Sequence, residues 1–156
     1  MREKAVTQGK IADILQARGQ LEEALRIRTE ELPVYERLGD VRSKAVTQGK
    51  IADILQARGQ LEEALRIRTE EELPVYERLG DVRELLVCRA KIALNLLARK
   101  APDDRQPANI LLCLALAEAQ RLGLPEAGQI AQILNHFEMD CGGAPLQPSG
   151  TANADQ

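Results

Sequence analysis

The sequence predicts an all-α fold, a helical-repeat solenoid built from antiparallel helix pairs. A block of about forty residues occurs twice, because residues 4–30 recur unchanged at 44–70 and residues 31–42 recur at 72–83. Self-similarity at a period of roughly 20–50 residues is typical of arrays in which each unit buries its apolar face against the next. Aromatic residues make up 2% of the chain while hydrophobic residues make up 44%. This composition favours helices that pack through leucine, isoleucine and alanine.

The periodicity divides the chain into five segments. Repeat 1 covers residues 1–39, repeat 2 covers 40–80, and a diverged repeat 3 covers 81–123. A capping helix is expected at 124–139 and a disordered tail at 140–156. The third copy is aligned by the residues that it shares with repeat 2 at an offset of 41, which are Val82, Val87, Lys91, Ile92, Ala93, Leu96, Ala98 and Arg99.

Each repeat is predicted to form two helices joined by a short turn. Apolar residues follow a helical spacing up to Gly19, where a left-handed glycine ends the first helix. A second helix opens at Gln20 and ends at Gly39. Asp40 then provides an N-cap for the next repeat, since its side chain can accept a hydrogen bond from an unpaired helix amide.

The two copies differ by one inserted residue, Glu71, which lies just before Pro74 in the second helix. One extra residue would rotate the rest of a regular helix by about 100°. Tyr76 and Leu79 must nevertheless face the core, as their counterparts do in repeat 1. We therefore expect a bulge or a break in the helix between Glu71 and Pro74.

The middle of each repeat resembles the tetratricopeptide repeat (TPR) family. Residues 19–25, of sequence GQLEEAL, follow Ile11, Ala12 and Leu15 and recur at 59–65. Gln8 and Arg28 stand where the family has large aromatic residues, and the repeat is about six residues longer than the usual 34. The chain thus resembles a long-repeat variant of about 40 to 42 residues per unit.

The resemblance implies a right-handed superhelix whose first helices line a concave face that binds a protein or peptide. We expect a non-catalytic interaction scaffold that holds a peptide or a helical segment on that face. An alternative interpretation is that the same side chains are solvated charges on an exposed surface. The residues expected on the concave face are Lys10, Asp13, Gln16, Lys50, Asp53 and Gln56.

A second hypothesis is self-association into a homo-oligomer. The sequence Gly-Asp-Val precedes each later copy but not the first, so the first helix is expected to present an uncovered apolar side. Val6 and Ile14 are the residues expected on it. Arrays without a polar end cap tend to associate. A third hypothesis, that the chain is a regulatory fragment of a larger multidomain effector, rests on the resemblance and on this abrupt start.

Composition disfavours several other function classes. The net charge is −3, and acidic and basic residues alternate, which disfavours nucleic-acid binding. No apolar segment reaches the roughly 20 residues of a membrane span, so we expect no membrane partner and a cytoplasmic location. The sequence has no phosphate-binding loop or nucleophile motif, and we expect no enzymatic activity and no cofactor.

The cysteines and the single histidine give no strong metal or disulfide signal. Cys88, Cys113 and Cys141 are an odd number, and two of them lie in apolar helical patterns, so free thiols are expected. His136 lies near Asp140 and Cys141, but so few ligands at a helix end make a poor site. No metal site is predicted.

Overall fold

The computed structural model describes residues 1–142, and every regular element within them is helical. This confirms the predicted all-α helical-repeat fold. The described residues divide into two compact units, with the boundary between Gly80 and Asp81. Of the expected disordered tail, residues 143–156 lie outside the described part.

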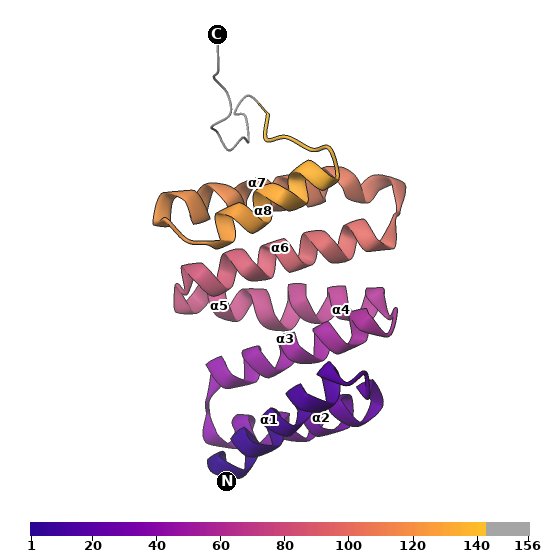
Figure 1. Ribbon diagram of the computed structural model, residues 1–156. Coiled ribbons are helices and arrows are strands. Elements are labelled where there is room, and N and C mark those ends of the chain that lie inside the picture. The colour runs from indigo at the N-terminus through magenta and orange to yellow at the C-terminus, as the bar shows by residue number, and fades with distance from the viewer. Residues whose placement is uncertain (143–156) are drawn as a thin grey trace. The chain divides into compact units, whose positions relative to one another are not determined.

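The first unit contains the two near-identical repeats, each an antiparallel helix pair (Figure 1). Its helices pack in chain order, so that α2 lies against α1 and α3 lies against α2. The elements are α1 (Arg2–Ala17), α2 (Leu21–Leu38), α3 (Val41–Ala57), α4 (Leu61–Ile67), the π-helical turn η1 (Arg68–Glu72) and α5 (Leu73–Leu79).

The predicted turn residues are confirmed. Gly19 and Gly39 adopt φ values of 79° and 67°, a left-handed conformation that side chains with a Cβ rarely tolerate. Asp40 caps α3, because its Oδ1 accepts a hydrogen bond of 2.9 Å from the backbone amide of Ser43. Its Oδ2 accepts a second bond of 2.6 Å from Arg2 on α1. The joint between the repeats is therefore fastened to the first helix.

The expected irregularity at the inserted glutamate is also confirmed. The second helix of repeat 1 is continuous, whereas that of repeat 2 is interrupted by η1, which contains Glu71. A π-helical turn bonds i to i+5 and so accommodates one extra residue locally. Tyr76 consequently stays buried, as Tyr35 does in repeat 1. The expectation that Leu79 faces the core is wrong, because Leu79 is 46% exposed and its counterpart Leu38 is 41% exposed.

The second unit consists of α6 (Val82–Arg99), the 3-10 turn η2 (Pro102–Asp104), α7 (Arg105–Leu122) and α8 (Glu126–His136). Helices α6 and α8 both pack against α7. Helix α7 is buried along the sides that face α6 and α8, at Ala108, Leu112 and Leu116 among others. Ile110 and Leu114 remain 51% and 50% exposed, because neither α6 nor α8 covers the side of α7 on which they lie.

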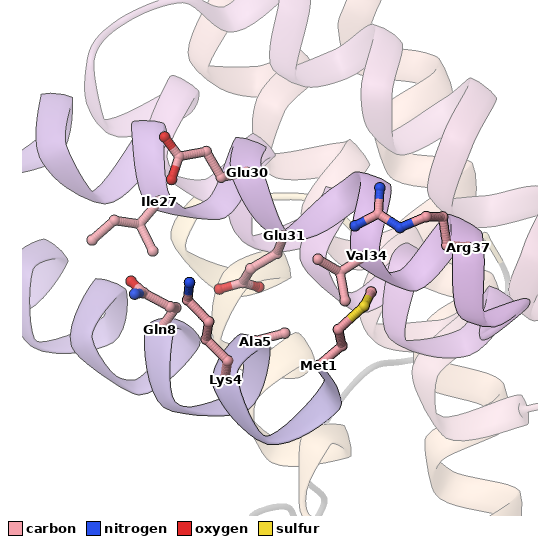
Figure 2. A pocket seen from close by; sticks show the side chains of 9 residues that line it. All are labelled: Met1, Lys4, Ala5, Gln8, Ile27, Glu30, Glu31, Val34 and Arg37. Carbon is pink, nitrogen blue, oxygen red and sulfur yellow. The ribbon is translucent and has the colours of Figure 1, made fainter.

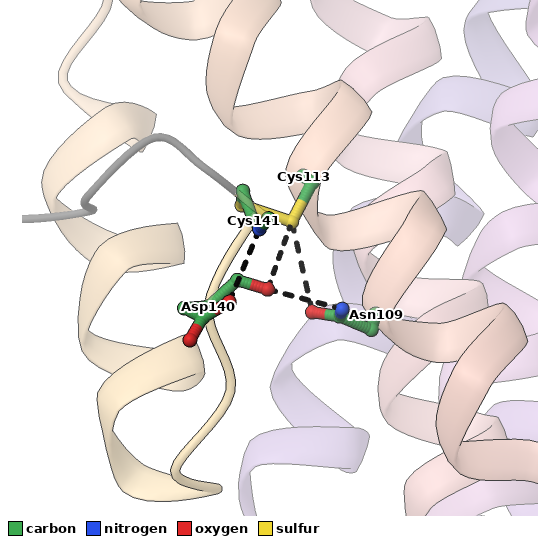
Figure 3. Close-up of a disulfide and its surroundings, with 5 residues drawn as sticks. Asn109, Cys113, Asp140 and Cys141 are labelled. Carbon is green, nitrogen blue, oxygen red and sulfur yellow. Dashed lines mark hydrogen bonds between the residues drawn. A yellow bond between two sulfur atoms is a disulfide. The ribbon is translucent and has the colours of Figure 1, made fainter.

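The expectation of free thiols is wrong for two of the three cysteines. Cys113 on α7 and Cys141 form a disulfide, while Cys88 is free and buried (Figure 3). After α8 the chain returns along α7, and Asn109 donates a 3.1 Å hydrogen bond to the carbonyl of Asp140. The return of the chain brings together two cysteines that are 28 residues apart. Their pairing therefore depends on tertiary structure rather than on local sequence.

Deleting Glu71 should leave the first unit folded, with a free energy of unfolding within about 1 kcal/mol of the parent. The deletion makes the second helix of repeat 2 identical in sequence to α2, which is regular. Deleting Glu30 from α2 is the matched control. It removes a residue where none is in excess, rotates Glu31 and Tyr35 by about 100° and should unfold the unit. Urea denaturation followed by circular dichroism measures the free energy of unfolding of both deletion variants. An equal loss of stability in the two would contradict the idea that Glu71 is the surplus residue.

Stability between pH 4 and 2 should depend on Asp40. Hydrogen bonds from Arg2 and Ser43 lower the pKa of Asp40 from 3.8 to about 2. A lowered carboxyl pKa stabilises the fold above the unfolded value, and this stability is lost as pH falls toward the folded value. Asp40→Asn keeps a good N-cap but does not titrate, so its free energy of unfolding should fall less than that of the parent across about pH 4 to 2. Arg2→Gln should give a dependence of the unfolding free energy on pH that lies between those of the parent and Asp40→Asn. Curves of unfolding free energy against pH that run parallel for the parent and Asp40→Asn would contradict the prediction.

Candidate functional site

A buried arginine joins the two helices of repeat 1. Arg28 on α2 is 6% exposed and binds Asp13 on α1. Its Nη1 also lies 3.3 Å from Oε1 of Glu31, which is 3% exposed. Burial raises the pKa of Glu31, and the positive charge of Arg28 offsets part of this rise. Thr47 of α3 donates a 3.3 Å hydrogen bond to the same carboxylate, which links the cluster to the next repeat.

Repeat 2 contains the same arrangement. Arg68 is fully buried and lies 2.6 Å from Asp53 and 3.6 Å from Glu72. Gln56 Oε1 is 3.4 Å from the same guanidinium. Arg28 and Glu31 are three residues apart, whereas Arg68 and Glu72 are four apart because Glu71 has been inserted. The π-helical turn thus keeps the carboxylate facing its arginine.

Two glycines make room for these buried charges. A Cβ added at Gly9 would lie 2.9 Å from Nη1 of Arg28, and one added at Gly49 would lie 2.4 Å from Oε2 of Glu72. The first helix of each repeat therefore lacks a side chain at the point where the charged groups of the second helix approach. Gly9 and Gly49 follow Gln8 and Gln48, near the place of a large aromatic in the TPR pattern. In this chain, a contact between buried charged groups therefore lies where the TPR pattern has a contact of a large aromatic side chain.

A groove runs between α1 and α3 above this buried cluster, with a volume of about 290 Å³. We call it the α1–α3 groove. Its walls combine the basic side chains of Lys10 and Lys50 with the apolar side chains of Val6 and Val46. Lys50 Nζ lies 3.8 Å from Oδ1 of Asp13, so the two walls are bridged across the groove. The lining residues are Ala5, Val6, Gly9, Lys10, Asp13, Arg28, Glu31, Tyr35, Arg42, Ser43, Val46, Thr47 and Lys50.

The structure places three of the six residues expected to bind a partner in this groove: Lys10, Asp13 and Lys50. The other three, Gln16, Asp53 and Gln56, do not line it. Asp53 and Gln56 instead accept hydrogen bonds from Arg68, and Gln16 is half-buried. The spacing of three residues placed the six residues on one side of the first helix of each repeat. It did not reveal that Asp53 and Gln56 on this side contact the buried Arg68.

Val6 and Ile14, the residues expected to mediate self-association, lie on different sides of α1. Val6 lines the α1–α3 groove and is 43% exposed, and its counterpart Val46 is 37% exposed. Its exposure is therefore a property of that helix position and does not depend on a preceding repeat. Ile14 is 57% exposed, whereas its counterpart Ile54 is fully buried. Of the two positions, only that of Ile14 changes from exposed to buried between repeat 1 and repeat 2.

A second hollow lies between the helices of each pair, where they diverge near the start of the first helix (Figure 2). In repeat 1 it has a volume of about 300 Å³, and in repeat 2 its counterpart has about 210 Å³. Figure 2 shows the carboxylate of Glu31 pointing from α2 toward Ala5 on α1, with Lys4 beside it. The residues that line this hollow come from one repeat, whereas those of the α1–α3 groove come from two successive repeats.

The described residues contain no group of three or more histidine, cysteine or acidic side chains that could hold a metal ion. Cys141, one of the ligands considered above, is held in the disulfide. Within residues 1–142, no helix has the length and apolarity needed to cross a bilayer.

Gly49→Ala should destabilise the first unit by about 1 kcal/mol. Overpacking a buried contact costs about 1–3 kcal/mol, and the higher helix propensity of alanine returns about 1 kcal/mol. Gly9→Ala should cost less, because its closest contact is longer. Gly128→Ala on α8 is the control, since a Cβ there meets nothing within 4 Å and should be neutral or stabilising. Chemical denaturation checks the order, and a stable Gly49→Ala protein would mean that the buried carboxylate moves aside easily.

Comparison with known families agrees with this architecture. Residues 3–70 match the family model of the tetratricopeptide repeat. A search of curated proteins found no match to the chain. Tetratricopeptide repeats generally mediate protein–protein interaction, and the family is typically non-catalytic. Residues 3–70 are therefore similar to tetratricopeptide repeats, which supports a TPR-like helical-repeat architecture for this part of the chain.

Proposed function

We propose that this chain is a non-catalytic interaction module that binds a peptide or helical segment of a partner protein in the α1–α3 groove. The observation that carries the proposal is the composition of the groove, in which basic and apolar side chains from two successive repeats face one opening. A binding site built on helices is held more precisely than one built on loops.

The electrostatics of the groove favour an acidic partner segment. Arg28 with Asp13 and Glu31 carries a formal charge of −1, and Lys10, Arg42 and Lys50 bring the lining of the groove to a formal charge of +2. Lys10 and Lys50 line the groove, where Lys10 is exposed and Lys50 is half-buried. A partner carboxylate placed between them would gain a charge-assisted hydrogen bond, while Val6 and Val46 would contact a small apolar side chain. The α1–α3 groove therefore suits a segment in which acidic and small apolar residues alternate.

Asp53 is unsuitable as a test position, because it binds the buried Arg68 and its removal would leave that charge without an essential partner. Lys10 and Lys50 can be changed without this effect. They occupy equivalent positions in the two repeats, so a double variant removes one charge from each repeat.

Lys10→Gln with Lys50→Gln should weaken the binding of peptides selected on the parent chain by at least about tenfold, on the order of 1.4 kcal/mol. The peptides come from a display library of random sequences, and their affinity is measured by fluorescence anisotropy. Arg37→Gln with Arg78→Gln is the matched control, since it removes the same charge from equivalent exposed positions outside the groove. Selected peptides that bind the Lys10/Lys50 variant as tightly as the parent would exclude the groove as the site.

A further inference from the structure

The contact between the two repeats shows what kind of surface covers one side of a first helix. On α3, the side that faces repeat 1 carries Thr47, Ile51 and Ile54, which are 3%, 6% and 0% exposed. Helix α2 packs against α3 along its length, with basic residues of α3 at each end of the contact. The contacts are Lys44 with Glu36 at 3.1 Å, Thr47 with Glu31 at 3.3 Å, Ile54 with Ala24 and Ile27, and Arg58 with Glu22 at 2.6 Å.

Helix α1 carries the same five side chains at the same spacing, because the repeats are identical over this range. We call them the α1 stripe: Lys4, Thr7, Ile11, Ile14 and Arg18. All five are exposed. Ile11 is 41% exposed where Ile51 is 6% exposed, and Ile14 is 57% exposed where Ile54 is fully buried. One chemical surface is thus present twice, once covered by a helix and once open.

We propose that the α1 stripe docks an acidic amphipathic helix of a partner protein, one that reproduces the pattern of α2. The required helix has alanine and a branched aliphatic residue at the centre of its contact face and glutamates toward both ends. The central residues cover Ile11 and Ile14, and the glutamates pair with Lys4 and Arg18. Identical side chains on the same backbone present the same apolar area and charges, so they select the same kind of helix.

A second copy of this chain does not offer such a helix within residues 1–142. The contact face of α2 is already occupied by α3. The corresponding residues of repeat 2, Ala64 and Ile67, are 0% and 5% exposed. The apolar face of α8 is likewise turned inward, because Ile130 and Leu134 are buried. Within residues 1–142, a second copy therefore has no free helix that reproduces the α2 pattern.

This inference goes beyond the proposed function, because the two surfaces share no residue. The α1–α3 groove uses Val6, Lys10 and Asp13 of α1, whereas the stripe uses other positions. One chain can accordingly bind a peptide in its groove and a helix on its stripe.

The test uses the intact chain and a synthetic peptide of residues 20–39, which carries the α2 sequence. Isolated helices of this length are marginally stable in water, so the peptide is cross-linked between positions 26 and 30. Arg26 and Glu30 suit the cross-link because they pair with each other on the exposed side of α2. Binding of the labelled peptide to the chain is followed by fluorescence anisotropy.

The peptide should bind the parent chain saturably, and Ile14→Glu should weaken binding by at least about tenfold, since a buried charge replaces a central apolar contact. Ile110→Glu is the matched control, because Ile110 is equally exposed on α7 and lies outside the stripe. Circular dichroism verifies that both variants fold. A peptide with lysine at positions 22 and 36 should bind poorly to the parent, and Lys4→Glu with Arg18→Glu should restore its binding.

Failure of the cross-linked helix to bind, or equal binding to the Ile14→Glu chain, would overturn the proposal. So would a dimer of the parent chain, seen by sedimentation, that Ile14→Glu dissociates, because the occupant would then be a second copy. The Lys10/Lys50 variant should bind the α2 peptide as tightly as the parent does. Loss of groove binding and loss of stripe binding are therefore separable.

Discussion

The buried arginine of each repeat is the contact on which the first unit depends. Arg28 and Arg68 are buried, and each joins a partly exposed carboxylate of the preceding helix to a buried carboxylate of its own helix. Burying charges is costly unless they are paired in good geometry, so the helix spacing must match the arginine. A glycine on the first helix provides that spacing. The distance and rotation between the two helices of a repeat follow from this constraint.

The inserted glutamate shows how strictly the constraint acts. An extra residue could have shifted the whole end of the second helix, but the chain forms a π-helical turn instead. The turn returns Glu72 to Arg68 and Tyr76 to the core within a few residues. The change of register is confined to the turn, and the surfaces on either side of it keep the register of repeat 1.

The two candidate binding surfaces of the first unit follow from the same packing. Pairing of Arg28 with Asp13 fixes one side of α1, and the α1–α3 groove opens above it. Packing of α2 on α3 covers one apolar stripe and leaves its duplicate on α1 exposed. Because rigid helices carry both surfaces, a partner meets side chains that are already positioned, and this lowers the entropy lost on binding.

The sequence by itself determined the helix pairs, the glycine turns, the Asp40 cap and the irregularity at Glu71, because these depend on residues close together in the chain. Comparison of the two copies, rather than the local pattern, also predicted the exposure of Ile14. Only the tertiary structure showed that Arg28 and Arg68 are buried, that Asp53 serves Arg68, and that Cys113 bonds to Cys141. A helical sequence pattern predicts which face of its helix an arginine lies on. It does not predict whether the neighbouring helix places a carboxylate and a glycine opposite that arginine. Identical residues such as Ile14 and Ile54 differ in burial for the same reason: exposure is a property of the neighbours, and local sequence does not contain them.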